Sequence, residues 1–162
     1  MNKHGSLRNI RLLLEWLTFI SIVALIAIFA LTAGILPPPP PHLYREGGGF
    51  VAEYGMRPIL LLLFLAACAL IALLFLLSRF PRLYRYPVKI TAGNVEVQYL
   101  LAKIMLGVAQ LVCAVYFSLL MLFVYRMQIR LESPLFACLT AAAGAAVGVD
   151  YLVYLAAARK NR

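Results

Sequence analysis

The chain is dominated by four long runs of apolar residues separated by short polar segments. The runs cover about residues 12–36, 59–77, 100–125 and 134–158. Each approaches or exceeds the ~20 residues that an α-helix needs to cross a hydrocarbon core of ~30 Å. None of them alternates between polar and apolar residues as a membrane β-strand does. Since only helices and closed barrels satisfy their backbone hydrogen bonds in lipid, the pattern predicts four transmembrane helices.

The third helix is predicted to begin before its apolar run. Pro81 and Pro87 interrupt the segment that follows the second run, because proline removes a backbone donor and clashes with the preceding turn. Thr91 is then the expected N-cap of the next helix. The expected fold is an all-α, single-domain membrane bundle of four helices, over about residues 12–36, 59–77, 92–127 and 134–158.

Composition and charge support a membrane protein. The chain is 64% hydrophobic and 13% charged, whereas an ordinary soluble domain is about 45–50% apolar and about 25% charged. The net charge is +9, but the basic residues flank the apolar runs and do not line one face. This arrangement indicates contact with lipid headgroups and a fixed membrane orientation. We therefore expect the lipid bilayer as a partner and no binding of nucleic acid.

The distribution of Lys and Arg predicts that both termini are cytoplasmic, because cytoplasmic loops carry the excess of positive charge. Four of these residues fall on the predicted outer side: Arg45, Arg57, Arg126 and Arg130. The other eleven fall at the two ends of the chain and between the second and third helices: Lys3, Arg8, Arg11, Arg79, Arg82, Arg85, Lys89, Lys103, Arg159, Lys160 and Arg162. The expected location is the cell membrane of a bacterium, with several membrane passes.

Catalytic and metal-binding patterns are not visible in the sequence. Cys68, Cys113 and Cys138 lie inside apolar runs without metal-ligand spacing, which is typical of thiols that pack as small hydrophobes. No nucleophile–base pair, ligand set or phosphate-binding loop can be recognised. His42 lies in the first outer loop without a second His or Cys at ligand spacing, which favours a solvated loop over a metal site. We expect a protein that is not an enzyme and has neither cofactor nor metal.

Two segments carry a resemblance to a known family. The segment after the second helix contains Phe80-Pro81, Tyr86-Pro87-Val88, Ile90-Thr91, Asn94 and Gln98-Tyr99, and the outer loop contains Pro40-Pro41-His42-Leu43, Gly49, Tyr54-Gly55 and Arg57. Over about residues 36–105 the chain resembles a bacterial family of small membrane proteins of unknown function. The same domain forms the N-terminal part of the longer sporulation-delaying toxin immunity proteins.

The resemblance implies a non-enzymatic membrane protein that binds a partner or ligand at the outer loop or at the basic cytoplasmic loop. The chain departs from the family at Ala52, Ala92, Gly93 and Val97, where polar or charged residues are usual, and in a glycine-rich stretch about two residues longer. The candidate residues for binding a ligand or protein partner are His42, Tyr54, Arg57, Tyr86, Pro87, Asn94, Gln98 and Tyr99. We expect the last five to form a turn that caps the cytoplasmic end of the bundle.

Asp150 is the deepest acidic residue of the predicted helices. It precedes Arg159 by nine residues and so lies roughly 13 Å inside the cytoplasmic end, where a carboxylate costs about 2.5–3.5 kcal/mol. It is either a functional acid in a wet cavity or a structural partner of Lys103 or Tyr99. Its replacement by Asn is expected to destabilise the protein through loss of that pair.

Gly144 and Gly148 form a Gly-x-x-x-Gly pattern that lets two helices approach closely. The sequence does not distinguish between packing inside the bundle and homodimerisation as the role of these glycines. Asp150 should point largely away from this seam, because two residues correspond to about 200° around a helix.

Glu15 allows a second functional hypothesis, a small dimeric proton-linked transporter that uses Asp150 or Glu15. Small four-helix multidrug exporters have a glutamate in their first helix. Glu15 lies four residues after Arg11, however, so an ion pair near the membrane interface is the favoured interpretation.

Overall fold

The computed structural model describes residues 3–35, 57–80, 86–127 and 134–161. These residues form four helices, α1 (Lys3–Ile35), α3 (Arg57–Arg79), α4 (Val95–Met127) and α5 (Pro134–Lys160). All four are long and apolar enough to cross a membrane. The all-α, four-helix part of the sequence prediction is therefore confirmed.

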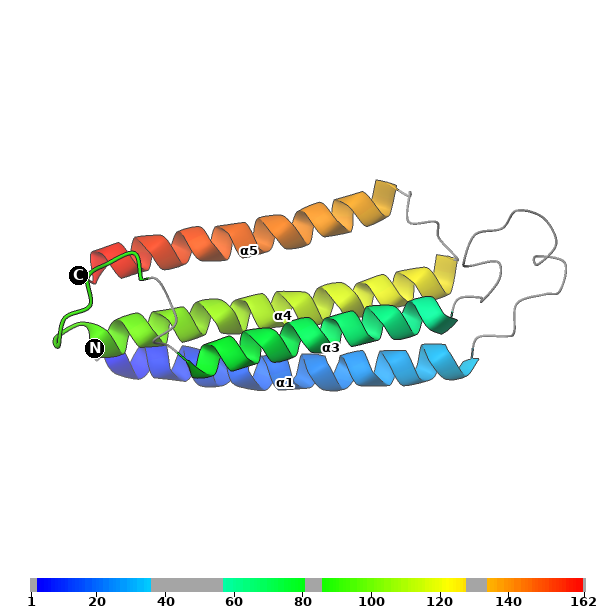
Figure 1. The fold of residues 1–162 in the computed structure, drawn as a ribbon, viewed down its shortest axis with the longest axis horizontal. Helices are drawn as coiled ribbons and strands as arrows, with labels where there is room; N and C mark the ends of the chain where they lie inside the picture. The colour runs from blue at the N-terminus through cyan, green and yellow to red at the C-terminus, as the bar shows by residue number, and fades with distance from the viewer. Residues whose placement is uncertain (1–2, 36–56, 81–85, 128–133, 162) are drawn as a thin grey trace, which may run out of the picture.

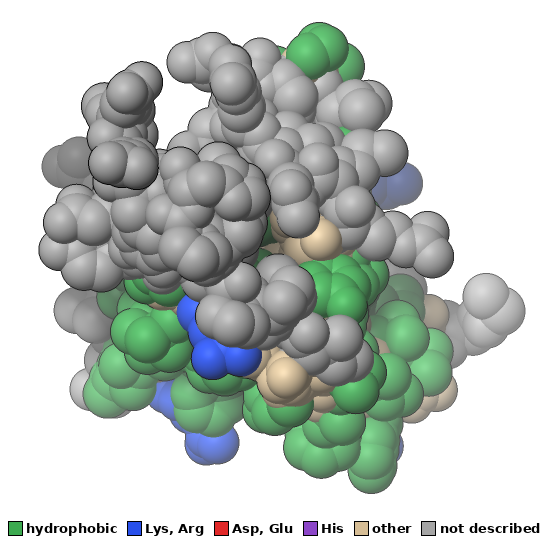
Figure 2. Space-filling view, turned by 90° about the vertical axis from the view of Figure 1, so that its right-hand side faces the viewer, with side chains coloured by type: hydrophobic (Ala, Val, Ile, Leu, Met, Phe, Trp, Pro, Cys, Tyr) green, Lys and Arg blue, Asp and Glu red, His purple; other side chains and the backbone are tan. Residues whose placement is uncertain are grey.

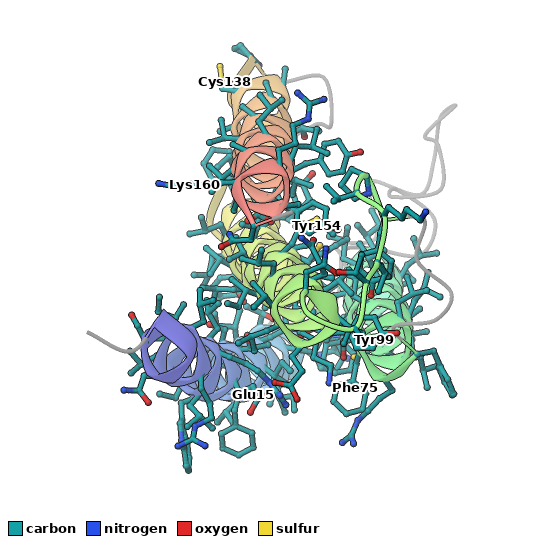
Figure 3. All side chains as sticks on the ribbon, turned by 90° about the vertical axis from the view of Figure 1, so that its left-hand side faces the viewer. Glu15, Phe75, Tyr99, Cys138, Tyr154 and Lys160 are labelled. Atoms are coloured by element: carbon teal, nitrogen blue, oxygen red, sulfur yellow. The ribbon has the colours of Figure 1, made fainter. Side chains whose placement is uncertain are left out.

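The helices run alternately up and down, so that both chain ends lie at the same end of the bundle (Figure 1). Helix α4 is central and packs against α1, α3 and α5, whereas α5 packs against α4 alone among the described helices. Viewed from the end that carries the termini, α1 and α3 lie on one side of α4 and α5 lies on the other (Figure 3). This arrangement leaves much of α5 without a protein neighbour.

Two apolar clusters hold the bundle together. The larger one joins Leu25 of α1, Leu60 and Ala67 of α3, and Met121 and Ala114 of α4, each less than 2% exposed. Phe29 and Phe64 stack across α1 and α3 with ring centroids 4.3 Å apart. A smaller cluster at the end with the termini joins α4 to the last turns of α5 through Leu101, Ala102, Tyr154 and Ala158.

The outward faces of the helices are apolar. Leu13, Leu62 and Leu152 are each more than 60% exposed, as is Trp16. Hydrophobic side chains also cover the visible flanks of the helices at the end where α1 ends and α3 begins (Figure 2). Monomeric soluble proteins rarely expose apolar surface on this scale, so these faces are suited to lipid.

Helix α1 begins at Lys3, earlier than the residue 12 that the apolar run predicts. The extra residues include Lys3, Arg8 and Arg11, which hydropathy does not count although they favour helices well. At 33 residues, α1 and α4 are each about 50 Å long. They therefore extend beyond a hydrocarbon core of ~30 Å.

The N-cap prediction for Thr91 is wrong, because α4 begins at Val95 and Asn94 precedes it. The Asn94 carbonyl accepts from the Gln98 N–H at 3.0 Å, and the Thr91 carbonyl accepts from the Val95 N–H at 3.1 Å. The Asn94 Oδ1 accepts from the Thr91 N–H at 2.8 Å, and its Nδ2 donates to the Lys89 carbonyl at 3.1 Å. Asn94 therefore fixes the turn before the helix, and Thr91 belongs to that turn.

Candidate functional site

A cavity of about 630 Å³ lies between α1 and α3, with α4 as its floor. We call it the inner cavity, because its charged end lies at the end of the bundle that the sequence predicts to face the cytoplasm. Phe19, Ile26 and Cys68 of its lining are exposed, so it is also open along the side of the bundle. Helix α1 contributes Glu15 and α3 contributes Phe75 to its walls, and both side chains lie in the space between the two helices (Figure 3). A volume of this size is within the usual range for small-molecule sites, about 300–1,000 Å³.

Four charged residues surround the mouth of the inner cavity: Arg11, Glu15, Arg79 and Lys103. The Nε of Arg11 donates to the Oε1 of Glu15 at 2.7 Å, which confirms the ion pair that the sequence predicts. The Arg79 guanidinium lies 5.1 Å from the centroid of the Phe75 ring, a cation–π contact. Lys103 has no carboxylate within ion-pair distance in the described part of the chain. The mouth therefore carries three cations and one carboxylate.

A second hollow of about 540 Å³ lies beside the mouth, between the first turns of α1 and α4. Arg8, Glu96 and Tyr99 line it, together with Arg11 and Lys103, which also line the inner cavity. Arg11 and Lys103 consequently stand between two hollows and can be reached from either side.

Two buried polar side chains line the inner cavity below its mouth. Thr18 of α1 is 7% exposed and Gln110 of α4 is 8% exposed. The Thr18 Oγ1 and the Gln110 Nε2 have no hydrogen-bond partner among the described residues. Each lies seven residues beyond a cation of the mouth, Arg11 or Lys103, which is about 10 Å along its helix. Buried polar groups are usually paired, so these two are suited to a ligand that accepts hydrogen bonds.

Below these polar groups the walls are apolar. Phe19, Ile22 and Ile26 of α1 face Ile71 and Cys68 of α3 across the cavity. The cavity extends from Arg79 to Cys68 along α3 and from Arg11 to Ile26 along α1, about 16 Å and about 22 Å respectively. The extent along α3 is close to one leaflet of the hydrocarbon core, ~15 Å, and the extent along α1 exceeds it by about half.

The residues of the predicted cytoplasmic turn do come together, but mainly as a structural cap. Gln98 is fully buried, and its Nε2 donates to the carbonyls of Ala158 at 3.0 Å and Asn161 at 3.1 Å. The Tyr86 and Tyr99 rings pack with centroids 5.6 Å apart. Pro87 is exposed in the turn. Of the five predicted turn residues, Tyr99 is the one that lines either of the two hollows.

The remaining candidate binding residues lie elsewhere. Arg57 begins α3 at the opposite end of the bundle. His42 and Tyr54 fall outside the ranges that the structure describes, so their predicted roles stay predictions. In the described helices no three His, Cys, Asp or Glu side chains gather, and no metal centre can be named there.

The expected pair between Asp150 and Lys103 or Tyr99 is not formed. The Asp150 Oδ2 is buried and has no hydrogen-bond partner in the described chain. Gln98 marks the face of α4 that meets α5, and Lys103 lies five residues further, which is about 140° around the helix. Lys103 therefore reaches the cavity on the far side of α4, where Asp150 cannot meet it.

Asp150 itself lies on the face of α5 that meets α4. It is four residues from the buried Tyr154 and seven from Ala157, both of which belong to the apolar cluster between the two helices. Tyr154 points from α5 toward α4 in Figure 3, whereas Cys138 and Lys160 point away. Asp150 also lies roughly midway between two contacts that set the helix register, Gln98 with Ala158 and the Tyr116 hydroxyl with Thr140 at 3.0 Å.

Gly144 and Gly148 are exposed, and a Cβ built on either would meet no atom within 4 Å. In the described structure, these glycines therefore do not pack against another helix of the bundle, which is one of the two roles that the sequence leaves open. Their seam points away from α4 and from Asp150, as the helical spacing predicts.

Thr18, Gln110 and Arg79 are not among the site residues predicted from the sequence. Thr18 and Gln110 do give a signal, because each is a polar residue inside an apolar run. What the sequence does not reveal is that α1 and α4 turn these two side chains into the same cavity.

Comparisons with protein-family models, with curated proteins and with solved structures find no match for this chain. The function is therefore inferred from the geometry described above.

Proposed function

We propose that this chain is a non-enzymatic multi-pass protein of the cell membrane that acts by binding a ligand in the inner cavity. The observation that carries the proposal is the cavity itself, which combines a charged mouth, two buried unpaired polar groups and apolar walls. This combination is what ligand sites typically offer: a mainly apolar surface with a few polar groups that fix orientation.

We also propose an orientation of the protein in the membrane. Both termini and the mouth of the inner cavity face the cytoplasm, as the distribution of Lys and Arg indicates. Arg79 is the last residue of α3 and precedes the basic loop between α3 and α4. The mouth therefore lies beside the loop that the sequence predicts to bind a partner or ligand. A bacterial origin and a role like that of the immunity-associated family rest on the resemblance of residues 36–105. A protein partner could then bind at the basic loop or the outer loop.

Native mass spectrometry of the protein released from a mild detergent tests whether the cavity holds a ligand. We expect the wild-type protein to retain bound mass beyond that of the chain. Ala72 lines the cavity, so Ala72→Phe should fill part of it and reduce the bound fraction. Ala66→Phe is the matched control, because Ala66 is an exposed alanine of α3 that does not line the cavity. No bound mass in the wild type, or equal loss in both variants, would overturn the proposal.

Asp150 supports a second candidate, a proton-linked transporter. A carboxylate near the middle of α5 with a buried, unpaired oxygen is the kind of group that proton carriers use. Glu15 is less suited, because it is paired with Arg11 and more than half exposed. Proteoliposomes with an internal pH-sensitive dye and an imposed pH gradient test this candidate. A proton flux that disappears in Asp150→Asn would support it, and equal rates would reject it.

A further inference from the structure

We infer that the inner cavity binds one anionic phospholipid from the cytoplasmic leaflet. The phosphate lies among Lys103, Arg79 and Arg11, and an acyl chain follows the apolar wall toward Ile26. This inference rests on the proposed function, since it names the class of ligand that the same cavity takes.

The charges at the mouth select for an anion. Three cations line the mouth, and its one carboxylate, Glu15, already accepts from Arg11. Lys103 and Arg79 make no ion pair within the described ranges. Hydrogen bonds between cationic side chains and a phosphate are about twice as strong as neutral ones. Lys103 and Arg11 can also be reached from the neighbouring hollow, which leaves room for the headgroup beyond the phosphate.

The mouth lies at the level of lipid headgroups. Helix α3 has 23 residues, or about 35 Å, and is bounded by Arg57 and Arg79. A helix of this length just crosses a core of ~30 Å, so Arg79 stands at one interface. Lys103 and Arg11 line the same mouth and therefore lie near the same level. From there the cavity descends by about the thickness of one leaflet, which is the reach of an acyl chain.

The buried polar pair gives the phospholipid a further contact. The Gln110 Nε2 is a donor and the Thr18 hydroxyl can donate, and both lie about 10 Å below the cations. A phospholipid has its ester carbonyl oxygens below the phosphate, on the side of these two groups, so they are the acceptors that it brings nearest to them. A hydrocarbon chain alone would leave both groups unpaired at a cost in free energy. A free phosphate ion would not reach the walls formed by Ile22 and Ile71.

Fluorescence quenching by brominated lipids tests the inference in the full-length protein. Trp16 is the single tryptophan, and its ring centroid lies 6.4 Å from that of Phe19, so both positions would report the same lipid. The reporter protein therefore carries Trp16→Phe and Phe19→Trp, because Phe19 lines the cavity. The control protein carries Trp16→Phe and Leu152→Trp and reports the surrounding lipid, because Leu152 is 63% exposed on α5 and does not line the cavity. Both are reconstituted in phosphatidylcholine with a small fraction of brominated phosphatidylglycerol or brominated phosphatidylcholine. We expect brominated phosphatidylglycerol to quench the reporter more strongly than brominated phosphatidylcholine, and the two lipids to quench the Leu152→Trp control equally.

Charge variants of the reporter protein then locate the phosphate. Lys103→Gln should weaken the binding of brominated phosphatidylglycerol about tenfold, because a charge-assisted hydrogen bond is lost. Lys160→Gln is the matched control, since Lys160 is a cation at the same end that points away from the bundle (Figure 3). Equal losses in the two variants would mean general attraction to the surface, and would overturn the inference.

Two further outcomes separate this inference from the proposed function. Equal quenching of the reporter by both brominated lipids would overturn the inference that the ligand is an anionic phospholipid. If Ala72→Phe still reduced the bound mass, the proposal that the cavity binds a ligand would stand. Relief of quenching by inorganic phosphate or glycerol phosphate would show that a soluble anion takes the site, and would also overturn the lipid. Absence of bound mass in native mass spectrometry would remove the proposed function itself.

Discussion

Gln98, in the first turn of α4, donates a hydrogen bond to the main-chain carbonyl of Ala158, in the last turn of α5, at 3.0 Å. A second hydrogen bond from the same Nε2 reaches the carbonyl of Asn161 at 3.1 Å. The last carbonyls of a helix have no partner within the helix, so a side chain from α4 satisfies them here. Because α5 packs against α4 alone in the described structure, this contact holds one end of an otherwise weakly supported helix.

Gln98→Leu should reduce the free energy of unfolding by about 1–3 kcal/mol. The change removes the hydrogen bonds to the carbonyls of Ala158 and Asn161. It also removes the buried Gln98 Oε1, which has no partner among the described residues, and this offsets part of the loss. Unfolding by a denaturing detergent, followed by circular dichroism, measures the loss. Gln110→Leu is the control, because the Gln110 Nε2 has no partner in the described protein and its loss should cost little. A smaller effect at Gln98 than at Gln110 would contradict the role of Gln98 as the cap of α5.

Asp150→Leu should stabilise the protein, whereas the pair expected from the sequence predicts that Asp150→Asn destabilises it. The structure shows a buried oxygen without a partner, so the substitution removes a buried polar group and strands no opposite charge. A gain of about 1–3 kcal/mol is expected from the cost of a carboxylate in the membrane. Unfolding in detergent measures it, with Asp150→Asn as the variant that keeps the shape and removes the charge. A clear loss of stability in both variants would mean that Asp150 has a polar partner after all.

The sequence predicts the helices well because hydropathy reports membrane depth directly. The predicted second and fourth helices, 59–77 and 134–158, differ from α3 and α5 by two residues at most at either end. The start of α1 is missed by nine residues, because the helix continues into a polar segment that hydropathy does not mark. The Thr91 cap fails because Asn94, three residues later, offers both a donor and an acceptor to the turn.

The site is harder to predict, because uniformly apolar helices give little indication of which faces meet. Lys103 and Asp150 both lie at a depth where an ion pair is plausible, yet they lie on opposite sides of α4. The i, i+4 pair of Arg11 and Glu15 is predicted correctly, since it depends on one helix only. The cavity is formed by α1, α3 and α4 together. Residue spacing within each helix does not determine how these three helices are placed relative to one another.

Labelling of single cysteines tests the orientation. In a protein with Cys68, Cys113 and Cys138 replaced by alanine, a cysteine is introduced at Gly48 or at Ala92. Ala92 is exposed in the turn before α4. With the termini inside, an impermeant maleimide should label the Gly48 position on intact cells and the Ala92 position only after lysis. Labelling at Ala92 but not at Gly48 on intact cells would reverse the orientation and place the cavity mouth outside.

Gly148→Ile tests what the glycine seam of α5 does. No atom lies within 4 Å of a Cβ built at Gly144 or Gly148, so the larger side chain meets no obstacle in the monomer. The free energy of unfolding of the monomer should stay the same or rise by about 0.5 kcal/mol, because glycine is a poor helix former. A seam buried inside the bundle would instead be overpacked by isoleucine and lose about 1–3 kcal/mol, which would contradict the described packing.

Association of copies is measured on the same proteins by energy transfer between differently labelled chains in vesicles. Ala142→Ile is the matched control, because Ala142 is exposed on α5 and lies about 160° from Gly144 around the helix. Energy transfer that is present in the wild type, kept in Ala142→Ile and lost in Gly148→Ile would assign the seam to a homodimer, since only small residues let two backbones approach closely. Energy transfer that Gly148→Ile leaves unchanged would exclude the seam as the contact between copies, and the glycines would then face lipid.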